Sequence, residues 1–329
     1  MKKVVLTGIK PTGTPHIGNY FGAIKPALEL AQNDEYDCYY FIADYHALNQ
    51  IKEPEVLKNY VKELACTWLA CGIDPKKVVF YKQSDLSEVT ELTWLISNVT
   101  SKGLMNRAHA YKALTQKAIE EGADPDSLVN MGLYNYPILM ASDILIVNSN
   151  LVPVGQDQKQ HVEMARDIAQ AFNKTYGNTF VVPKELIKKE VGLILGQDGR
   201  KMSKSYNNVI PLFAPSEKLR KLVMSIKTDS SLPTEPKPTD SAVFNLYSLF
   251  ANEKELEAEK KKYQKGLSWA EAKQDLFDIM EKTIAPMREK YDYYMAHFDE
   301  VEKILADGAK RVKSIARETI VRARKNMGL

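Results

Sequence analysis

The chain contains few cysteines, and their arrangement excludes two classes of protein. Only three of its 329 residues are cysteine, namely Cys38, Cys66 and Cys71. An odd number without close pairing argues against the disulfide framework of a small secreted protein. Cys66 and Cys71 are also not at the spacing of a zinc knuckle. We therefore expect buried, reduced thiols at these positions.

Long apolar runs are absent as well. No stretch reaches the roughly 20 apolar residues that a membrane-crossing helix requires. The N-terminal residues Met1 to Val5 are partly basic, but they lack the apolar region and the cleavage site of a signal peptide. They favour a first β-strand instead. We expect a cytoplasmic protein that has no membrane partner.

A strong net charge is the third absence. The formal net charge is +3, and 44% of the residues are apolar, which fits a globular protein of one large or two medium domains. Basic residues gather only near the C-terminus, where seven lie between Lys310 and Lys325 on a segment with helical apolar spacing. This pattern predicts a docked C-terminal helix with a cationic outer face. Such a face fits RNA phosphates and fits plain solvent equally well.

What the chain does contain is an alternation of strand and helix patterns. Short apolar runs that predict buried strands lie at residues 4–9, 38–44, 78–81 and 151–154. Helical patterns separate these runs, which predicts an α/β fold with a doubly wound, Rossmann-like parallel sheet over residues 1–212. A helical insertion is expected at about 85–135. The strand signal vanishes after Pro211, so residues 213–329 are expected to form an all-helical C-terminal domain.

The first strand is followed by the segment Pro15-His16-Ile17-Gly18-Asn19. The N-terminus of a helix offers unpaired N–H groups and the positive end of the helix dipole, and both attract phosphates. Gly18 allows a nucleotide to lie against the backbone. His16 and Asn19 fall on one side of the first turn, where both can donate to phosphate oxygens. Taken alone, so short a segment more often marks an ordinary helix start.

A second basic segment, Lys201-Met202-Ser203-Lys204-Ser205, follows a flexible polar stretch. A lysine carries a compact charge on a long stem, so it can follow a leaving pyrophosphate as it moves. Taken alone, a solvated basic loop is the better explanation. Together, and in this order on an alternating strand and helix pattern, the two segments predict a site that grips ATP from both sides.

This pair of segments resembles the two signature motifs of the class I aminoacyl-tRNA synthetases. Within that class the chain is similar to the tryptophanyl-tRNA synthetases over essentially its full length. The similarity is carried by residues 8–13 (Gly-Ile-Lys-Pro-Thr-Gly), 136–145 (Tyr-Pro-Ile-Leu-Met-Ala-Ser-Asp-Ile-Leu) and 152–161 (Val-Pro-Val-Gly-Gln-Asp-Gln-Lys-Gln-His).

The resemblance implies a ligase that works in two steps. Tryptophan reacts with Mg-ATP to give tryptophanyl-adenylate and pyrophosphate, and the tryptophanyl group then moves to the terminal adenosine of tRNA(Trp). ATP and Mg²⁺ are therefore expected, and the metal arrives with ATP rather than on protein side chains. The resemblance also implies a homodimer and a helical domain that binds the tRNA anticodon.

The same resemblance assigns roles to individual residues. The catalytic residues that meet the phosphates are expected to be His16, Asn19, Lys201, Lys204 and Lys112. Further ATP contacts are expected from Lys10, Gly18, Gly155, Asp157, Met202, Ser203 and Ser205. The tryptophan pocket is expected to comprise Leu6, Thr7, Gly8, His46, Tyr136, Met140, Asp143, Val152, Val154 and Gln158. The chain departs from the family at Lys10, where glutamine is common, and at Gln156, where glutamate is frequent.

Asp143 also has a physical argument of its own. Indole carries one polar group, an N–H donor, on a large apolar body, so a selective pocket needs apolar walls and one buried acceptor. Asp143 lies within an apolar helix pattern, where a carboxylate is costly unless it is paired. The residues alone leave open whether its partner is the indole or a nearby lysine or backbone group. The family resemblance favours the indole.

Three alternatives remain open on the sequence. A tyrosyl-tRNA synthetase would need a donor and an acceptor for a phenol, which the segments around Asp143 and Asp157 fit less well. A small nucleotidyltransferase shares the first signature segment but usually lacks a long helical C-terminal half. A regulatory or RNA-binding relative without catalysis is disfavoured by the intact signature residues.

Overall fold

The computed structural model describes residues 2–187 and 193–329. Five strands in these residues form one parallel sheet in the order β3-β2-β1-β4-β5. The strands are β1 Lys3–Ile9, β2 Tyr36–Ile42, β3 Val78–Lys82, β4 Leu151–Val154 and β5 Lys184–Ile187. The predicted doubly wound α/β fold is thereby confirmed. Strand β5 has no counterpart among the predicted strands, because it is a four-residue edge strand that begins with two charged residues.

Helices occupy most of the remaining chain. They are α1 Ile17–Asn19, α2 Lys25–Leu30, α3 Asp44–Ala47, α4 Pro54–Ala70, α5 Glu88–Ser97, α6 Lys102–Met105, α7 His109–Glu120, α8 Met131–Ile146, α9 Lys159–Tyr176, α10 Ser216–Met224, α11 Ala242–Phe250, α12 Glu253–Lys265, α13 Trp269–Ala296 and α14 Phe298–Met327. Shorter π or 3₁₀ turns are η1 Tyr20–Ile24, η2 Gln83–Asp85, η3 Gln156–Gln158 and η4 Lys204–Tyr206. None of the helices in the described residues combines the length and the apolar character that crossing a bilayer requires.

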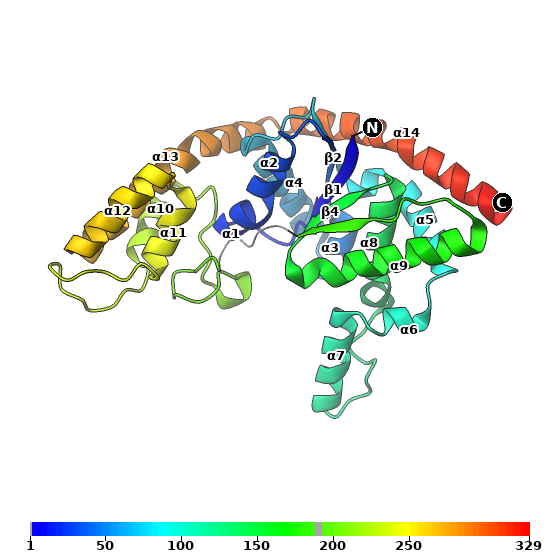
Figure 1. Ribbon diagram of the computed structural model, residues 1–329, viewed down its shortest axis with the longest axis horizontal. Helices are drawn as coiled ribbons and strands as arrows, with labels where there is room; N and C mark the ends of the chain where they lie inside the picture. Colours follow the sequence, from blue (N-terminus) through cyan, green and yellow to red (C-terminus); the bar gives the residue numbers. More distant parts are fainter. Residues whose placement is uncertain (1, 188–192) are drawn as a thin grey trace.

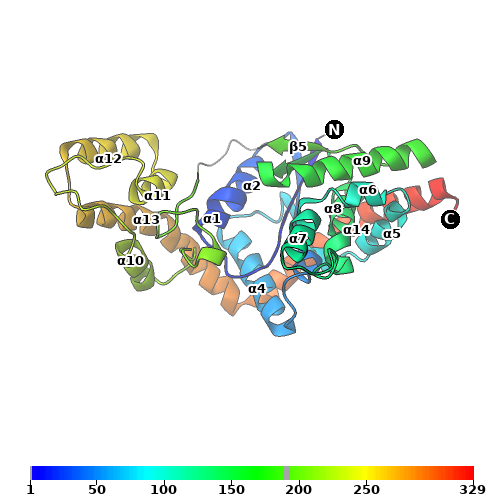
Figure 2. The ribbon, with the colours of Figure 1, turned by 90° about the horizontal axis from the view of Figure 1, so that it is seen from below.

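Helices cover both faces of the sheet (Figures 1 and 2). On one face Leu6 and Phe41 pack in a core with α5, α8 and α9, and on the other Tyr40 and Phe80 pack with α2 and α4. Successive residues of a strand point to opposite faces, so a sheet buried on both faces needs strands that are apolar almost throughout. The chain order reverses at β1, which lies between β2 and β4. The carboxyl ends of these strands therefore form the switch point where ligands bind in folds of this kind.

The helical C-terminal part divides between two locations. Helices α10, α11 and α13 form a core of their own, which also includes Ile17, Phe21 and Met202 from the two signature regions. Helix α14 instead runs back along the sheet domain and contacts strand β3 and helices α4, α5 and α8 (Figure 1). The predicted division at 212/213 therefore differs from the packing, because the last helix contributes its apolar face to the core of the sheet.

Close packing and arginine contacts dock α14. A Cβ atom at Gly308 would overlap the carbonyl group of Phe80, so the glycine allows the helix to touch β3. Arg317 pairs with Glu88 at 3.2 Å and Arg324 pairs with Glu91 at 2.9 Å. The expected docking of this helix is thus observed, but much of its expected cationic face is used in contacts within the chain.

Candidate active site

The first signature segment begins a helix whose first turn is capped by its own side chain. The backbone N–H of His16 donates to Oδ1 of Asn19 at 3.0 Å. This bond orients the Asn19 amide so that its Nδ2 donor remains available to a ligand. The N–H of Ile17 is already bonded to the carbonyl oxygen of Ile210 at 3.0 Å. One of the helix N–H groups that the sequence offers to phosphate is therefore used within the protein.

The two signature segments meet in space, although almost the whole sheet domain separates them in sequence. Lys204 Nζ donates to the carbonyl oxygen of Thr12 at 3.2 Å, and it lies 2.8 Å from where a Cβ atom of Gly13 would be. His16 is only 8% exposed. Burial, followed by the nearby Lys204 ammonium, lowers the pKa of His16 to about 4. The His16 ring is thus neutral at pH 7, and Nε2 or Nδ1 can donate one hydrogen bond to a phosphate oxygen.

Backbone pairing joins the same two regions. His16 and Pro211 form an isolated antiparallel bridge, and the N–H of Leu212 donates to the carbonyl oxygen of Pro15 at 3.0 Å. A Cβ atom at Gly18 would lie 2.9 Å from the His16 ring and 3.7 Å from the sulfur of Met202. Gly18 is therefore needed for the His16 ring to fold back over the helix, in addition to any role toward a nucleotide.

The second signature segment is held from inside by Asn208, a residue that the sequence analysis does not single out. Asn208 is 2% exposed. Its Oδ1 accepts from the N–H of Ser203 at 2.8 Å, and its Nδ2 donates to Lys201 O at 3.0 Å and to Asp198 Oδ1 at 2.6 Å. These bonds fix the backbone on both sides of Met202. They therefore determine the position of the backbone from which the side chains of Lys201 and Lys204 extend. The only available signal was an asparagine four residues beyond Lys204.

The polar side chains of this segment face outward, whereas Met202 is buried. Lys201 and Ser205 are exposed, as is Lys204 beyond its contact with Thr12. The hydroxyl groups of Ser203 and Ser205 lie 2.8 Å apart and bond to each other. Partial desolvation lowers the pKa of the Lys204 ammonium. Exposed amines and hydroxyls on a loop opposite His16 suit a segment that reaches toward a polyanion.

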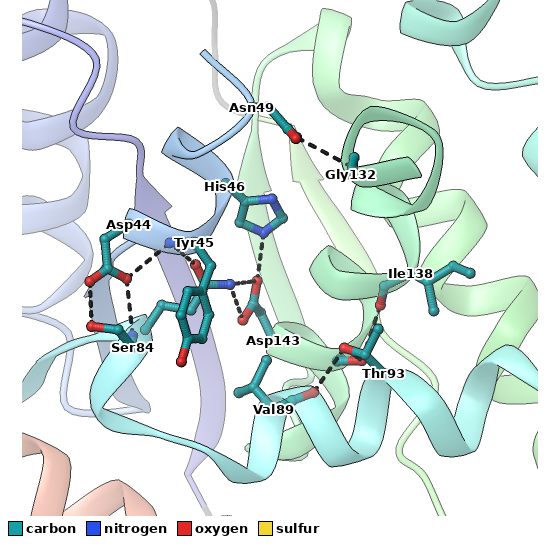
Figure 3. A network of polar contacts seen from close by, with 12 residues as sticks. Asp44, Tyr45, His46, Asn49, Ser84, Val89, Thr93, Gly132, Ile138 and Asp143 are labelled. Atoms are coloured by element: carbon teal, nitrogen blue, oxygen red, sulfur yellow. Dashed lines mark hydrogen bonds and ion pairs between the residues drawn. The ribbon is translucent and has the colours of Figure 1, made fainter. Parts of the chain in front are cut away.

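The second half of the site is a buried acid on α8. Asp143 is 3% exposed, and Figure 3 shows its carboxylate pointing toward the ring of His46. Its Oδ2 lies 2.9 Å from His46 Nε2, and Gln83 Nε2 donates to Oδ1 at 2.8 Å and to Oδ2 at 2.9 Å. Burial raises the pKa of Asp143, and the contacts with His46 and Gln83 lower it. Neither a lysine nor a backbone group is its partner among the described residues.

Tyr136 joins this cluster from about two turns earlier on α8. Its hydroxyl lies 2.6 Å from His161 Nε2. Its ring packs edge to face with the His46 ring, and the two ring centroids are 6.4 Å apart. His161 is 6% exposed on α9 and receives no role in the sequence analysis. A histidine on a helical pattern carries no local signal of such a contact, because its partner lies on another helix.

The expected apolar walls lie around the same strand ends. Leu6, Val152 and Val154 are buried in one core with the sheet, and Met140 packs partly buried against it. The Thr7 hydroxyl oxygen is buried without a hydrogen-bond partner among the described residues. Gly8 differs from the expectation in one respect. Its missing Cβ leaves space for the Phe41 ring, so packing alone already requires glycine there.

Several expected residues lie at the margin of this cluster. Lys112 is exposed on α7, which projects away from the sheet in Figure 1, and no hydrogen bond or ion pair in the described part of the chain ties its side chain to the signature segments. Lys10 and Gly155 are exposed at the ends of β1 and β4, and Gln158 is exposed at the end of η3. The side chain of Asp157 lies outside what the structure describes. Its backbone belongs to η3, directly after β4.

Charged groups that could hold a metal ion do not gather here. In residues 2–187 and 193–329, no group of three or more histidine, cysteine, aspartate or glutamate side chains has the proximity that a metal site needs.

Comparison with known proteins gives a consistent family. Residues 2–285 match the family model of class I tRNA synthetases for tryptophan and tyrosine. The chain is 49% identical to the tryptophan–tRNA ligase of Pseudomonas aeruginosa over 99% of this chain and 73% of that protein. It is 52% identical to the tryptophan–tRNA ligase of Xanthomonas campestris over 94% of this chain and 72% of that protein.

A solved structure agrees with the sequence comparisons. The tryptophanyl-tRNA synthetase of Campylobacter jejuni, solved in complex with ADP and tryptophan, superposes with a TM-score of 0.89 at 38% identity, and the match covers 99% of this chain and 100% of that one. The fold of this chain is therefore that of a solved tryptophanyl-tRNA synthetase over nearly its whole length. The chain therefore belongs to the class I tRNA synthetases of the tryptophan and tyrosine group, and within that group to the tryptophan–tRNA ligases.

Proposed function

We infer that this chain activates L-tryptophan with ATP and transfers it to tRNA(Trp). The observation that carries the proposal is that Lys204 lies against Thr12 and close to His16. The ammonium on its long side chain thus faces the helix turn that we expect to bind phosphate. Relatives about half identical in sequence are tryptophan–tRNA ligases, and a solved relative holds ADP and tryptophan. The proposal therefore rests on geometry and relationship together.

The first step requires little covalent chemistry from the protein. A carboxylate oxygen of tryptophan attacks the α-phosphorus of ATP, the bond from that phosphorus to the oxygen bridging to the β-phosphate breaks, and pyrophosphate leaves with the electron pair. The carboxylate is already ionised, so no general base is needed. Catalysis then consists of positioning the reactants and stabilising the charge that moves onto pyrophosphate.

The signature residues supply both functions. His16 and the Nδ2 group of Asn19 donate hydrogen bonds to the phosphates from the rigid side of the site. Lys201 and Lys204 neutralise the leaving pyrophosphate from the loop side, assisted by the hydroxyls of Ser203 and Ser205. Mg²⁺ is carried with ATP as part of the substrate. Lys112 would reach the phosphates only if α7 approached the signature segments.

The buried acid supplies the selectivity. We assign Asp143 as the acceptor for the indole N–H, between the apolar walls formed by Leu6, Met140, Val152 and Val154. Phenylalanine would leave this acceptor unpaired, at a cost of about 1–3 kcal/mol or more for a charged group. The amino acid's own charged groups are assigned to Thr7, Tyr136 and Gln158. His46 lies against Asp143, so we assign it to holding that carboxylate as well as to the substrate.

ATP would lie across the switch point of the sheet. We assign Gly8 and Gly18 to the adenine side of the nucleotide, with Met202 offering backbone groups. We assign Gly155 and Asp157, which follow β4 directly, to the ribose hydroxyls, because ligands of such sheets bind at the carboxyl ends of the strands. Lys10 lies exposed at the end of β1 and would add a positive charge near the phosphates.

Exchange of labelled pyrophosphate into ATP tests this function. Exchange should require tryptophan and should not occur with tyrosine or phenylalanine at the same concentration. Asp143→Ala should reduce the preference for tryptophan over phenylalanine far more than it reduces ATP binding. Equal exchange with tyrosine would transfer the chain to the tyrosine branch, and an unchanged preference in Asp143→Ala would remove Asp143 from its role.

The partners follow from the family but need their own tests. We propose that α10 to α13 bind the anticodon of tRNA(Trp), that the enzyme works in the cytoplasm, and that it is a homodimer. Trp94 on α5 is 72% exposed beside a hollow of about 410 Å³ lined by residues of α5, α6 and α8, which suits a contact with a second copy. Sedimentation of the Trp94→Asp variant should show a larger monomer fraction than the unaltered protein. An unchanged sedimentation pattern would place the dimer contact elsewhere.

A further inference from the structure

A fully buried amide, that of Gln83, contacts the proposed indole acceptor. It lies in η2, directly after strand β3, and is 0% exposed. We propose that Gln83 is a positioning residue for tryptophan recognition: it holds the Asp143 carboxylate so that a free lone pair points at the indole N–H. The inference rests on the role proposed above for Asp143.

Both ends of the Gln83 amide are bonded. Nε2 donates to Asp143 Oδ1 at 2.8 Å and to Oδ2 at 2.9 Å, and Oε1 accepts from the backbone N–H of Tyr45 at 3.1 Å. A backbone N–H can only donate, so the oxygen of the amide must face Tyr45. The NH₂ group must then face Asp143. The orientation that serves the acid is thus imposed by the backbone of a different element.

The segment that carries Tyr45 is itself held in place by hydrogen bonds to Asp44 (Figure 3). Asp44 Oδ1 accepts from the N–H groups of Tyr45 and Ser84, each at 3.0 Å, and its Oδ2 accepts from the Ser84 hydroxyl. Because Ser84 is the residue after Gln83, these bonds tie the end of β2 to the turn that carries the amide. Gln83 therefore has little freedom to follow Asp143 if the acid moves. The acid is held to the amide instead.

The lone pairs of Asp143 that these bonds leave unused are the ones that can accept from the substrate. A carboxylate offers about four lone-pair positions. Oδ2 faces both Gln83 and His46, whereas Oδ1 receives a bond from Gln83 alone among the residues that the structure describes. Oδ1 is therefore the oxygen with capacity for the indole N–H. A freely rotating carboxylate would present either oxygen, and its alternatives would include rotations that point no lone pair at the ring.

Gln83 also helps to keep the acid in the form that can accept. Burial raises the pKa of Asp143, and donation from His46 and Gln83 opposes this shift. A protonated carboxyl would turn an O–H donor toward the indole N–H donor, which is a mismatch. Removing the amide would thus cost affinity for tryptophan through both orientation and charge, while the phosphate side of the site would be unaffected.

Two variants and one matched control test the proposal. Gln83→Met has similar length and volume but cannot donate, and Gln83→Glu keeps the bond to Tyr45 N–H while losing the NH₂ donor. Ser142→Ala is the control, because Ser142 is also 0% exposed and adjoins Asp143, but its bonds within the described part of the chain go only to Ile138 and Thr93. Pyrophosphate exchange would give KM for tryptophan and for ATP, kcat, and the preference for tryptophan over phenylalanine.

Both Gln83 variants should raise KM for tryptophan about tenfold or more and lower the preference over phenylalanine, with KM for ATP and kcat within about twofold. Ser142→Ala should leave all four quantities near those of the unaltered enzyme. A purely structural role would instead lower kcat for every substrate and the thermal midpoint together. That outcome in both variants would overturn the proposal.

The proposal and the function beneath it can fail separately. If Asp143→Ala loses the preference for tryptophan while both Gln83 variants keep it, Gln83 has no positioning role and the assignment of Asp143 stands. If Asp143→Ala also keeps the preference, the recognition of indole by this acid is wrong, and the inference about Gln83 falls with it.

Discussion

The ammonium of Lys204 donates a hydrogen bond to the carbonyl oxygen of Thr12 across 3.2 Å, although 192 positions separate the two residues in sequence. Thr12 belongs to the loop that precedes the first signature segment, and Lys204 is the second lysine of the other. Because a carbonyl oxygen is a weaker partner for an ammonium than a phosphate is, bound ATP should take the lysine away from Thr12. The contact therefore holds Lys204, in the absence of ATP, close to the proposed phosphate site.

Replacing this lysine should slow chemistry rather than binding of the amino acid. Lys204→Ala removes a charge that acts on the leaving pyrophosphate, so single-turnover adenylate formation should fall about 100-fold. The dissociation constant for tryptophan should change by no more than about twofold. Rapid-quench measurement of adenylate would check this. A variant that forms adenylate at the original rate would show that Lys204 does not act on the phosphates.

Asn19 allows its structural role to be separated from its role toward ATP. In Asn19→Asp the carboxylate can still accept from the N–H of His16, as Oδ1 does now, but the Nδ2 donor is lost and a negative charge is added. We expect KM for ATP to rise about tenfold or more, and more than in Asn19→Ala, while KM for tryptophan changes little. If Asn19 served only to cap the helix, the aspartate variant would retain the original KM and the alanine variant would be the weaker one.

His16 should make stability depend on pH in a defined direction. Burial and the Lys204 ammonium lower its pKa to about 4 in the folded chain, from 6.5 for an ordinary histidine. The unfolded chain therefore binds this proton more readily, so the stability from a neutral His16 is complete above about pH 6.5 and is lost as the pH falls toward 4. Urea unfolding at about pH 7 and about pH 5 should show a smaller loss of free energy in His16→Gln than in the unaltered protein. A His16 NMR signal that titrates near its ordinary pKa would contradict this expectation.

Asn208 should matter for activity although its side chain is enclosed. Asn208→Ala removes the bonds to Ser203 N–H, Lys201 O and Asp198, so the signature loop loses its internal support. Adenylate formation should slow about tenfold or more, with tryptophan affinity retained. Asn207→Gly is the matched control, because Asn207 is exposed and has a φ of 50°, a backbone conformation that glycine adopts readily. Equal activity of the two variants would remove Asn208 from its supporting role.

The docking of the last helix predicts a loss of stability at one glycine. The Cβ atom of Gly308→Ala would overlap the backbone of Phe80, so α14 would have to shift away from β3. The free energy of unfolding should fall by about 3 kcal/mol. Gly22→Ala is the control, because a Cβ at Gly22 meets nothing within 4 Å. Thermal unfolding of both variants would check the difference, and equal midpoints would show that α14 accommodates the methyl group.

The sequence alone determined the class of the fold and the order of the chemistry-bearing segments. Apolar runs at 4–9 and 151–154 became β1 and β4, because strands buried on both faces must be apolar at nearly every position. The glycine and the basic residues of the two signature segments indicated a phosphate site, because backbone exposure and positive charge are local properties that the residues carry wherever the chain places them. Asp143 stood out for the same reason, as a charge inside an apolar helix.

Only the tertiary structure decided how those residues are held. Gln83 and Asp143 are 60 positions apart, and Tyr45 and Gln83 are 38 apart, so no local pattern joins them. The same holds for Asn208, whose partners surround it only after the loop has closed, and for His161 beside Tyr136. Helix α14 carried a strong helical period, but its position along β3 depended on the space at Gly308 and on acids such as Glu88 far earlier in the chain. Periodicity reports which face of an element is buried, whereas the identity of the neighbour is set by long-range packing and hydrogen bonding between elements.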